Sequence, residues 1–109
     1  MNWYESPFGH VKYALATSNK QMRKEGFNTS PSDAPACTIF FETNELIVFV
    51  DKKQAKYRKQ AEVIALIVHE AVHVWQEIKQ RMGEQNPSIE FEAYSIQQIV
   101  VNLVSDYYG

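Results

Sequence analysis

Apolar residues in the second half of the chain recur at the spacing of two long α-helices. The first covers about residues 55–82 and ends at Gly83, which suits a helix C-terminal cap. The second begins after Asn86, which suits an N-cap, with Pro87 at the first helical position, and it extends to about residue 107. The apolar stripe expected to face the core in the first helix comprises Ile64, Ile67, Ala71, Trp75, Ile78 and Met82. The corresponding stripe in the second helix comprises Ile89, Ala93, Ile96, Val100, Leu103 and Tyr107.

The first quarter of the chain predicts a further helix, over about residues 6–25. Val11, Leu15 and Met22 recur at helical spacing within this segment. Gly26 suits a cap at the end of such a helix, so the segment is expected to be helical as far as that glycine.

Two apolar runs rich in β-branched and aromatic residues predict a β-hairpin. They cover residues 37–42 and 46–51 and are joined by a turn at 43–45. Apolar residues in both runs follow one another without alternating with polar ones, so both faces of the small sheet are expected to be covered. A turn-rich loop at 28–36 precedes the hairpin. The order of these elements predicts an α+β fold: an N-terminal helix, a small sheet and two C-terminal helices.

Length and composition are those of one globular domain. The chain has 109 residues, with 45% hydrophobic and 22% charged residues. The net charge of −2 gives no reason to expect a nucleic-acid partner. Five cations cluster at residues 52–59, where a solvated helix surface is favoured over a nucleic-acid patch. Cys37, the single cysteine, cannot form an internal disulfide and is expected to be a buried apolar residue rather than a nucleophile.

No segment of the sequence predicts secretion or membrane insertion. Residues 1–10 have neither the basic region nor the apolar core of a signal peptide. The longest apolar run is far shorter than the roughly 20 residues that cross a bilayer. The expected location is therefore the cytoplasm, with no membrane partner.

The candidate chemistry lies in the first long helix, in the run His69-Glu70-Ala71-Val72-His73. Histidines four residues apart stand one turn apart on the same face of a helix. Two imidazoles at this separation can bind one tetrahedral Zn²⁺ at Zn–N distances of ~2.0–2.1 Å. Glu70 is turned about 100° around the axis, from where its carboxylate can reach a water at the metal. The alternative is that both histidines are hydrogen-bonded core residues of an amphipathic helix.

A third metal ligand is expected from the last helix. Glu90 and Glu92 lie on opposite borders of its predicted apolar stripe, and helical periodicity alone does not choose between them. Gln76 lies on the histidine side of the first helix, and it is a candidate partner for a ligand or for the oxyanion of a reaction.

The H-E-x-x-H run, a short connector and the following Glu90-Phe-Glu-Ala-Tyr94 resemble the zincin metallopeptidases, and within them the glutamate, or gluzincin, branch. In that branch the third ligand is the first glutamate of an E-x-x-A/S-D run, so the resemblance implies Glu90 as the third zinc ligand. Tyr94 stands where the family has an aspartate that orients a histidine, and it is a candidate for that role or for binding the oxyanion. Residues 73–76 and 92–94 are also similar to small zincin-like proteins encoded by phages and prophages.

The resemblance implies a minimal zincin-like domain over residues 1–109 with zinc-dependent endopeptidase activity on a peptide or protein. Glu70 is then expected to act as the general base, and the outer strand of the hairpin to bind an extended peptide by strand addition. One alternative is a non-catalytic, structural or regulatory protein of phage or prophage type that keeps the metal site. Another is an enzyme whose C-terminal segment, residues 105–109, plugs the cleft until it is displaced.

Overall fold

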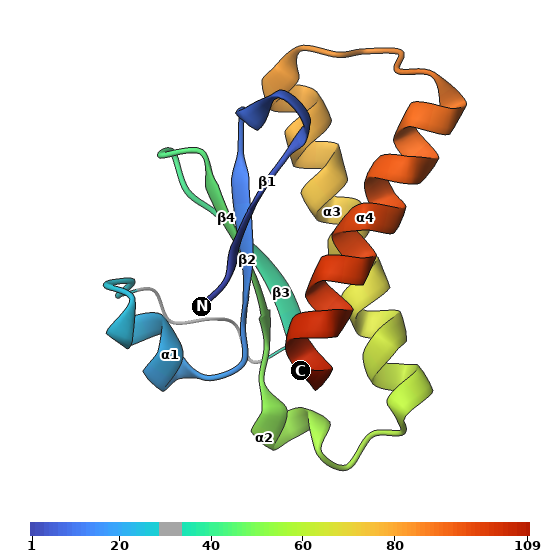
Figure 1. The fold of residues 1–109 in the computed structure, drawn as a ribbon. Helices are drawn as coiled ribbons and strands as arrows, with labels where there is room; N and C mark the ends of the chain where they lie inside the picture. Colours follow the sequence, from blue (N-terminus) through green and yellow to red (C-terminus); the bar gives the residue numbers. More distant parts are fainter. Residues whose placement is uncertain (29–33) are drawn as a thin grey trace.

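A four-stranded sheet with helices on both faces makes this an α+β protein (Figure 1). The structure is a computed structural model that describes residues 1–28 and 34–109, so most of the predicted loop at 28–36 lies outside the described residues. The strand order is β1-β2-β4-β3. The strands are β1 (Trp3–Glu5), β2 (Lys12–Ala16), β3 (Ala36–Phe40) and β4 (Glu45–Val50). The helices are the 3-10 turn η1 (Pro7–Gly9), α1 (Asn19–Lys24), α2 (Lys52–Ala55), α3 (Gln60–Met82) and α4 (Ile89–Tyr108).

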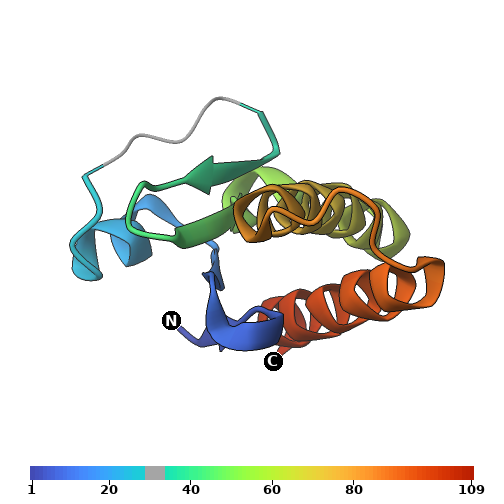
Figure 2. The same ribbon diagram turned by 90° about the horizontal axis from the view of Figure 1, so that it is seen from above.

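Helices α3 and α4 lie on one face of the sheet, and α1 lies on the other (Figures 1 and 2). α3 packs against β3 and β4, whereas α4 packs against β2 and α3. The core beneath the helix pair includes Val11, Tyr13, Leu46, Val48, Ile67, Trp75, Ile99 and Leu103. The core on the other face comprises Ala16, Met22, Ile47 and Phe49, with Trp3, Phe27, Cys37 and Ile39 packed against it. Both faces of β4 are therefore buried, which confirms the prediction from its unbroken apolar run. Among the described residues, no helix combines the length and the apolar character needed to cross a bilayer.

The predicted hairpin is confirmed by β3 and β4, which pair antiparallel with Ile39 opposite Ile47. Asn44 in its turn adopts a left-handed backbone with φ 64°, a conformation that asparagine tolerates better than most residues. β3 is the outermost strand of the sheet on the α3 side. Its outer edge is therefore available for pairing, as far as the described part of the chain goes.

The predicted helix over residues 6–25 is wrong, because the middle of this segment is strand β2. β2 lies between β1 and β4 and pairs in parallel with β4. Residues 13–16 are all buried, since helices cover both faces of the sheet, and such unbroken burial fits a central strand. The helix that does form, α1, begins after Ser18, whose side chain accepts a hydrogen bond from the backbone N–H of Gln21.

The predicted helix over residues 55–82 is confirmed from Gln60 onward, and Gly83 ends it with a left-handed φ of 73°. Residues before Lys59 instead form the short helix α2 and a turn. The cluster of cations at 52–59 therefore lies in α2 and in the turn before α3, not in the first turn of the long helix.

The last helix begins at Ile89, because Ser88 and not Asn86 supplies its N-cap: Ser88 Oγ accepts the backbone N–H of Phe91 at 3.1 Å. Its buried side is rotated from the predicted stripe and comprises Ser95, Ile99, Leu103 and Tyr107. Of the predicted stripe, Leu103 and Tyr107 are buried, Ile96 and Val100 are half-buried, and Ile89 and Ala93 are exposed. In this orientation the ring of Phe91 packs on Trp75 with centroids 5.8 Å apart, and Ile89 is 84% exposed.

Candidate functional site

The histidine pair lies on the side of α3 that α4 leaves uncovered. Trp75 follows His73 by two residues, about 200° around the helix, and its ring contacts Phe91 of α4. The side chain of His69 is 68% exposed, and His73 is exposed as well. The alternative that both histidines belong to the core is therefore wrong.

The two imidazoles converge, because His69 Nε2 and His73 Nε2 lie 3.2 Å apart. Two ligands of a tetrahedral Zn²⁺ with Zn–N distances of ~2.0–2.1 Å stand roughly 3.3–3.4 Å from each other. The pair therefore fits two of the four positions around such an ion. The same separation also suits a direct N–H···N hydrogen bond when one ring carries its proton on Nε2.

Gln76 orients the ring of His73 from the opposite edge. Gln76 Oε1 lies 3.0 Å from His73 Nδ1, and an amide oxygen only accepts, so the imidazole donates its Nδ1–H. A neutral ring protonated on Nδ1 keeps its lone pair on Nε2, which is the nitrogen that faces His69. The structure thus shows the contact of Gln76 with His73, and the role of Gln76 as the partner of a metal ligand or of the oxyanion stays a prediction.

Glu70 points from α3 toward the edge strand β3. The residue is 7% exposed, and its Oε1 accepts a hydrogen bond of 2.9 Å from Thr38 Oγ1. Its Oε2 lies 3.9 Å from His69 Nε2. The carboxylate is therefore held between the strand and the histidine pair. Sequence reasoning missed Thr38, since nothing in an apolar strand marks a residue as the partner of a glutamate 32 positions away.

A groove of about 420 Å³ opens beside His69 and Glu70 and follows the N-terminal half of α3. It is lined by Ala36, Arg58, Glu62, Ala65, Leu66, His69 and Glu70. Ala65 and Leu66 lie within about one helical turn of His69, whereas Arg58 and Glu62 lie around the start of α3. The C-terminal segment does not line this groove; it continues α4 as far as Tyr108, with Tyr107 buried against the core. The structure thus gives no support to the idea that residues 105–109 plug the cleft.

The structure does not bring a glutamate of α4 to the histidine pair. Within residues 1–28 and 34–109, no three His, Cys, Asp or Glu side chains are grouped so that they could hold one metal ion. Glu92 instead accepts a hydrogen bond of 2.8 Å from Trp75 Nε1, and Lys79 Nζ lies 3.5 Å from the same oxygen. The indole N–H, assisted by the lysine charge, holds the pKa of Glu92 below its usual value. Glu90 is exposed in the first turn of α4, and its role as the third ligand stays a prediction.

Tyr94 is 65% exposed on α4, four residues after Glu90. The structure places it in solvent and gives it no described contact with the histidine pair. Its role as a partner of a ligand or of the oxyanion likewise stays a prediction.

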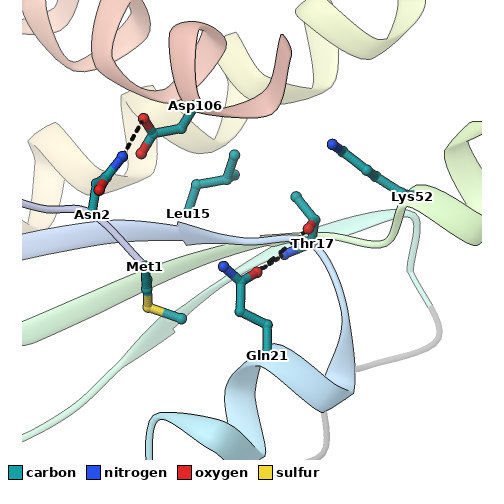
Figure 3. Close-up of a pocket in the computed structure, with 7 residues that line it drawn as sticks. All are labelled: Met1, Asn2, Leu15, Thr17, Gln21, Lys52 and Asp106. Atoms are coloured by element: carbon teal, nitrogen blue, oxygen red, sulfur yellow. Dashed lines mark hydrogen bonds between the residues drawn. The ribbon is translucent and has the colours of Figure 1, made fainter. Parts of the chain in front are cut away.

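A second pocket, of about 150 Å³, lies between the N-terminus, α1 and the end of α4, and contains none of the motif residues (Figure 3). It is lined by Met1, Asn2, Leu15, Thr17, Gln21, Lys52 and Asp106. Asp106 accepts hydrogen bonds from Asn2 Nδ2 at 3.1 Å and from the hydroxyl of Tyr4 at 2.7 Å. That second bond raises the pKa of Tyr4 to about 12, because it favours the protonated phenol. These contacts join the start of the chain to the last turn of α4.

No protein-family model matches the sequence, and comparisons with curated proteins and with solved structures found no similar protein. The likeness to zincins therefore depends on the motif residues and on the geometry described above.

Proposed function

We propose that this protein is a zinc-dependent peptidase of the zincin type, in which His69 and His73 bind the metal. One observation carries the proposal: two imidazole nitrogens converge to 3.2 Å on an open side of α3, beside the buried carboxylate of Glu70. Zn²⁺ held there would supply a Lewis acid that lowers the pKa of water and polarises a peptide carbonyl.

The protein's own groups then carry the proton transfers. Glu70 takes a proton from the attacking water and later delivers a proton to the nitrogen of the leaving amine. Thr38 supports this role, because its hydroxyl holds one carboxylate oxygen in place and leaves the oxygen nearer His69 to face the reaction. Gln76 acts as a positioning residue, since it sets the tautomer and the orientation of His73.

The substrate proposed for this site is an extended peptide paired with the outer edge of β3. β3 flanks the site directly, because Thr38 in this strand contacts the carboxylate of Glu70. Strand addition forms backbone hydrogen bonds whatever the sequence of the peptide, and the groove beside Leu66 receives side chains of the peptide.

The test compares zinc content and peptide hydrolysis in the wild type and three variants. The wild type is expected to bind one zinc per chain and to cleave an unfolded protein substrate. Glu70→Gln should keep the zinc and lose hydrolysis, whereas His73→Ala should lose both. Glu84→Gln, a change in an exposed glutamate just after α3, is the matched control and should behave as wild type. Hydrolysis that persists in purified Glu70→Gln would refute the assigned base.

A non-catalytic, zincin-like structural or regulatory protein of phage type is the second candidate function. One observation favours it: the motif side chains already hydrogen-bond to protein groups, with His73 bonded to His69 and Gln76 and Glu70 bonded to Thr38. The two candidates differ in one measurement, because this second one predicts zinc binding, or none, together with no hydrolysis of any peptide.

A further inference from the structure

Arg58 is the one cation of the basic segment 52–59 found among the described lining residues of the groove. Two lysines of that segment are directed elsewhere: Lys52 Nζ lies 5.0 Å from the ring centre of Tyr107, and Lys56 Nζ lies 4.9 Å from that of Tyr57. The guanidinium of Arg58 therefore gives the far end of the groove its positive charge.

Arg58 keeps donors for a ligand despite its acidic neighbour. Arg58 Nη1 lies 4.0 Å from Glu62 Oε2, and the side chains are 39% and 52% exposed. An ion pair this long and this exposed contributes little free energy, and a guanidinium has five N–H donors. A second carboxylate can thus bind the same guanidinium in the fork geometry that arginine favours.

The direction of β3 decides which part of a bound peptide reaches Arg58. β3 runs in the same direction as α3, because Thr38 in β3 contacts Glu70, and Asn44 in the turn after β3 accepts a hydrogen bond from Arg81 near the end of α3. A peptide that pairs antiparallel with β3, the more stable pairing, runs the opposite way. Its residues after the scissile bond therefore point along the groove toward Arg58.

The spacing along α3 sets how far from the scissile bond this contact lies. Glu62, the neighbour of Arg58, precedes Glu70 by eight helical residues, or about 12 Å at ~1.5 Å per residue. An extended peptide covers this distance in three to four residues at ~3.3 Å each.

We propose that the groove selects peptides with a carboxylate three to four residues after the scissile bond, and that Arg58 binds it. The carboxylate is either the free C-terminus of the peptide or the side chain of Asp or Glu. This inference rests on the proposed function, because only a peptidase has a scissile bond from which to count residues. The preference for a carboxylate in binding does not itself depend on metal or on hydrolysis.

The experiment measures peptide binding to metal-free Glu70→Gln protein by fluorescence anisotropy, so that no peptide is consumed. A neutral, N-terminally labelled hexapeptide of Ala and Leu is compared in three forms: with a free carboxylate end, with a carboxamide end, and with a carboxamide end and Glu as the last residue. Each peptide is also tested with Arg58→Gln, Arg58→Lys and Lys59→Gln added. Lys59 is the matched control, because it is the adjacent exposed cation and does not line the groove.

At least one carboxylate form is expected to bind about three- to tenfold more tightly than the neutral form, as a charge-assisted bond to a partly exposed guanidinium allows. The form that gains identifies the source, the C-terminus or an acidic side chain. Arg58→Gln should remove the gain, Arg58→Lys should keep only part of it because an ammonium lacks the two-pronged donor geometry of a guanidinium, and Lys59→Gln should retain it. Equal binding of all three peptides, or a preference that survives Arg58→Gln, would overturn the inference.

Failure of this inference and failure of the proposed function give different results. Zinc binding and hydrolysis without a carboxylate preference would remove the role of Arg58 and leave the peptidase. A preference that depends on Arg58, in a protein that neither binds zinc nor cleaves peptides, would leave a peptide-binding groove and remove the peptidase.

Discussion

The contact between Gln76 and His73 predicts that Gln76→Ala weakens zinc binding by a measurable amount. Gln76→Ala removes the acceptor of the His73 Nδ1–H, so the ring loses both its fixed orientation and its preference for a free lone pair on Nε2. The glutamine is exposed and its replacement is a good helix former, so the metal-free protein should change in stability by less than about 0.5 kcal/mol.

The expected loss of zinc affinity is 10- to 100-fold, the usual effect of removing the outer partner of a ligand histidine, or roughly 1.4–2.7 kcal/mol. Zinc in excess stabilises the folded state in proportion to the logarithm of its affinity. A chain of 109 residues unfolds with an entropy of about 0.23 kcal/mol/K near its midpoint. The Tm of the zinc-loaded variant should therefore lie about 6–12 °C below that of the zinc-loaded wild type.

The assay pairs isothermal titration calorimetry with thermal unfolding, each in zinc and in EDTA. Gln80→Ala is the matched control, because Gln80 is an exposed glutamine one turn further along α3. Equal zinc affinity in Gln76→Ala and wild type would refute the orienting role. A drop in Tm of similar size in EDTA would show that Gln76 supports the helix rather than the ligand.

Three further predictions concern the carboxylates and their partners. Thr38→Val should lower the rate of hydrolysis about tenfold with zinc affinity unchanged, since Glu70 loses a charge-assisted hydrogen bond; an unchanged rate would refute this. Glu90→Ala should weaken zinc binding in calorimetry and Glu92→Ala should not, and the reverse result would reassign the third ligand. The Trp75 indole lowers the pKa of Glu92 in the folded protein, so Glu92 takes up a proton at higher pH in the unfolded chain than in the folded one. The stabilisation from this contact is therefore present above pH 4.5 and is lost as the pH falls through the lower pKa of the folded state. Urea unfolding should therefore show Glu92→Gln to be less stable than wild type at pH 7, with the difference shrinking toward pH 3.

The contacts among His69, His73 and Gln76 are predictable from the sequence because they are local. His69 and His73 are brought together by one turn of helix, and Gln76 joins them by the same 3.6-residue repeat, so no knowledge of the rest of the fold is needed. The end of that helix is equally local, since Gly83 adopts a left-handed backbone at low cost. The hairpin was predictable for the same reason, because its two strands are neighbours in the chain.

Contacts between distant segments were decided by packing. The segment around β2 has apolar residues at helical spacing, at Val11, Leu15 and Met22, yet β2 is a strand that pairs in parallel with β4 and is covered on both faces. The orientation of α4 likewise places Phe91 against Trp75 of α3, a contact that no pattern within α4 reveals.

The surroundings of the motif have the same non-local origin. Thr38 reaches Glu70, and Arg58 reaches the groove, only because the sheet places the edge strand β3 alongside α3. Helical periodicity relates residues a few positions apart, whereas the pairing of a strand with a helix 30 residues later depends on the free energy of the whole core. The local pattern therefore identifies the residues of the candidate site, and the packing of sheet against helix defines the groove around them.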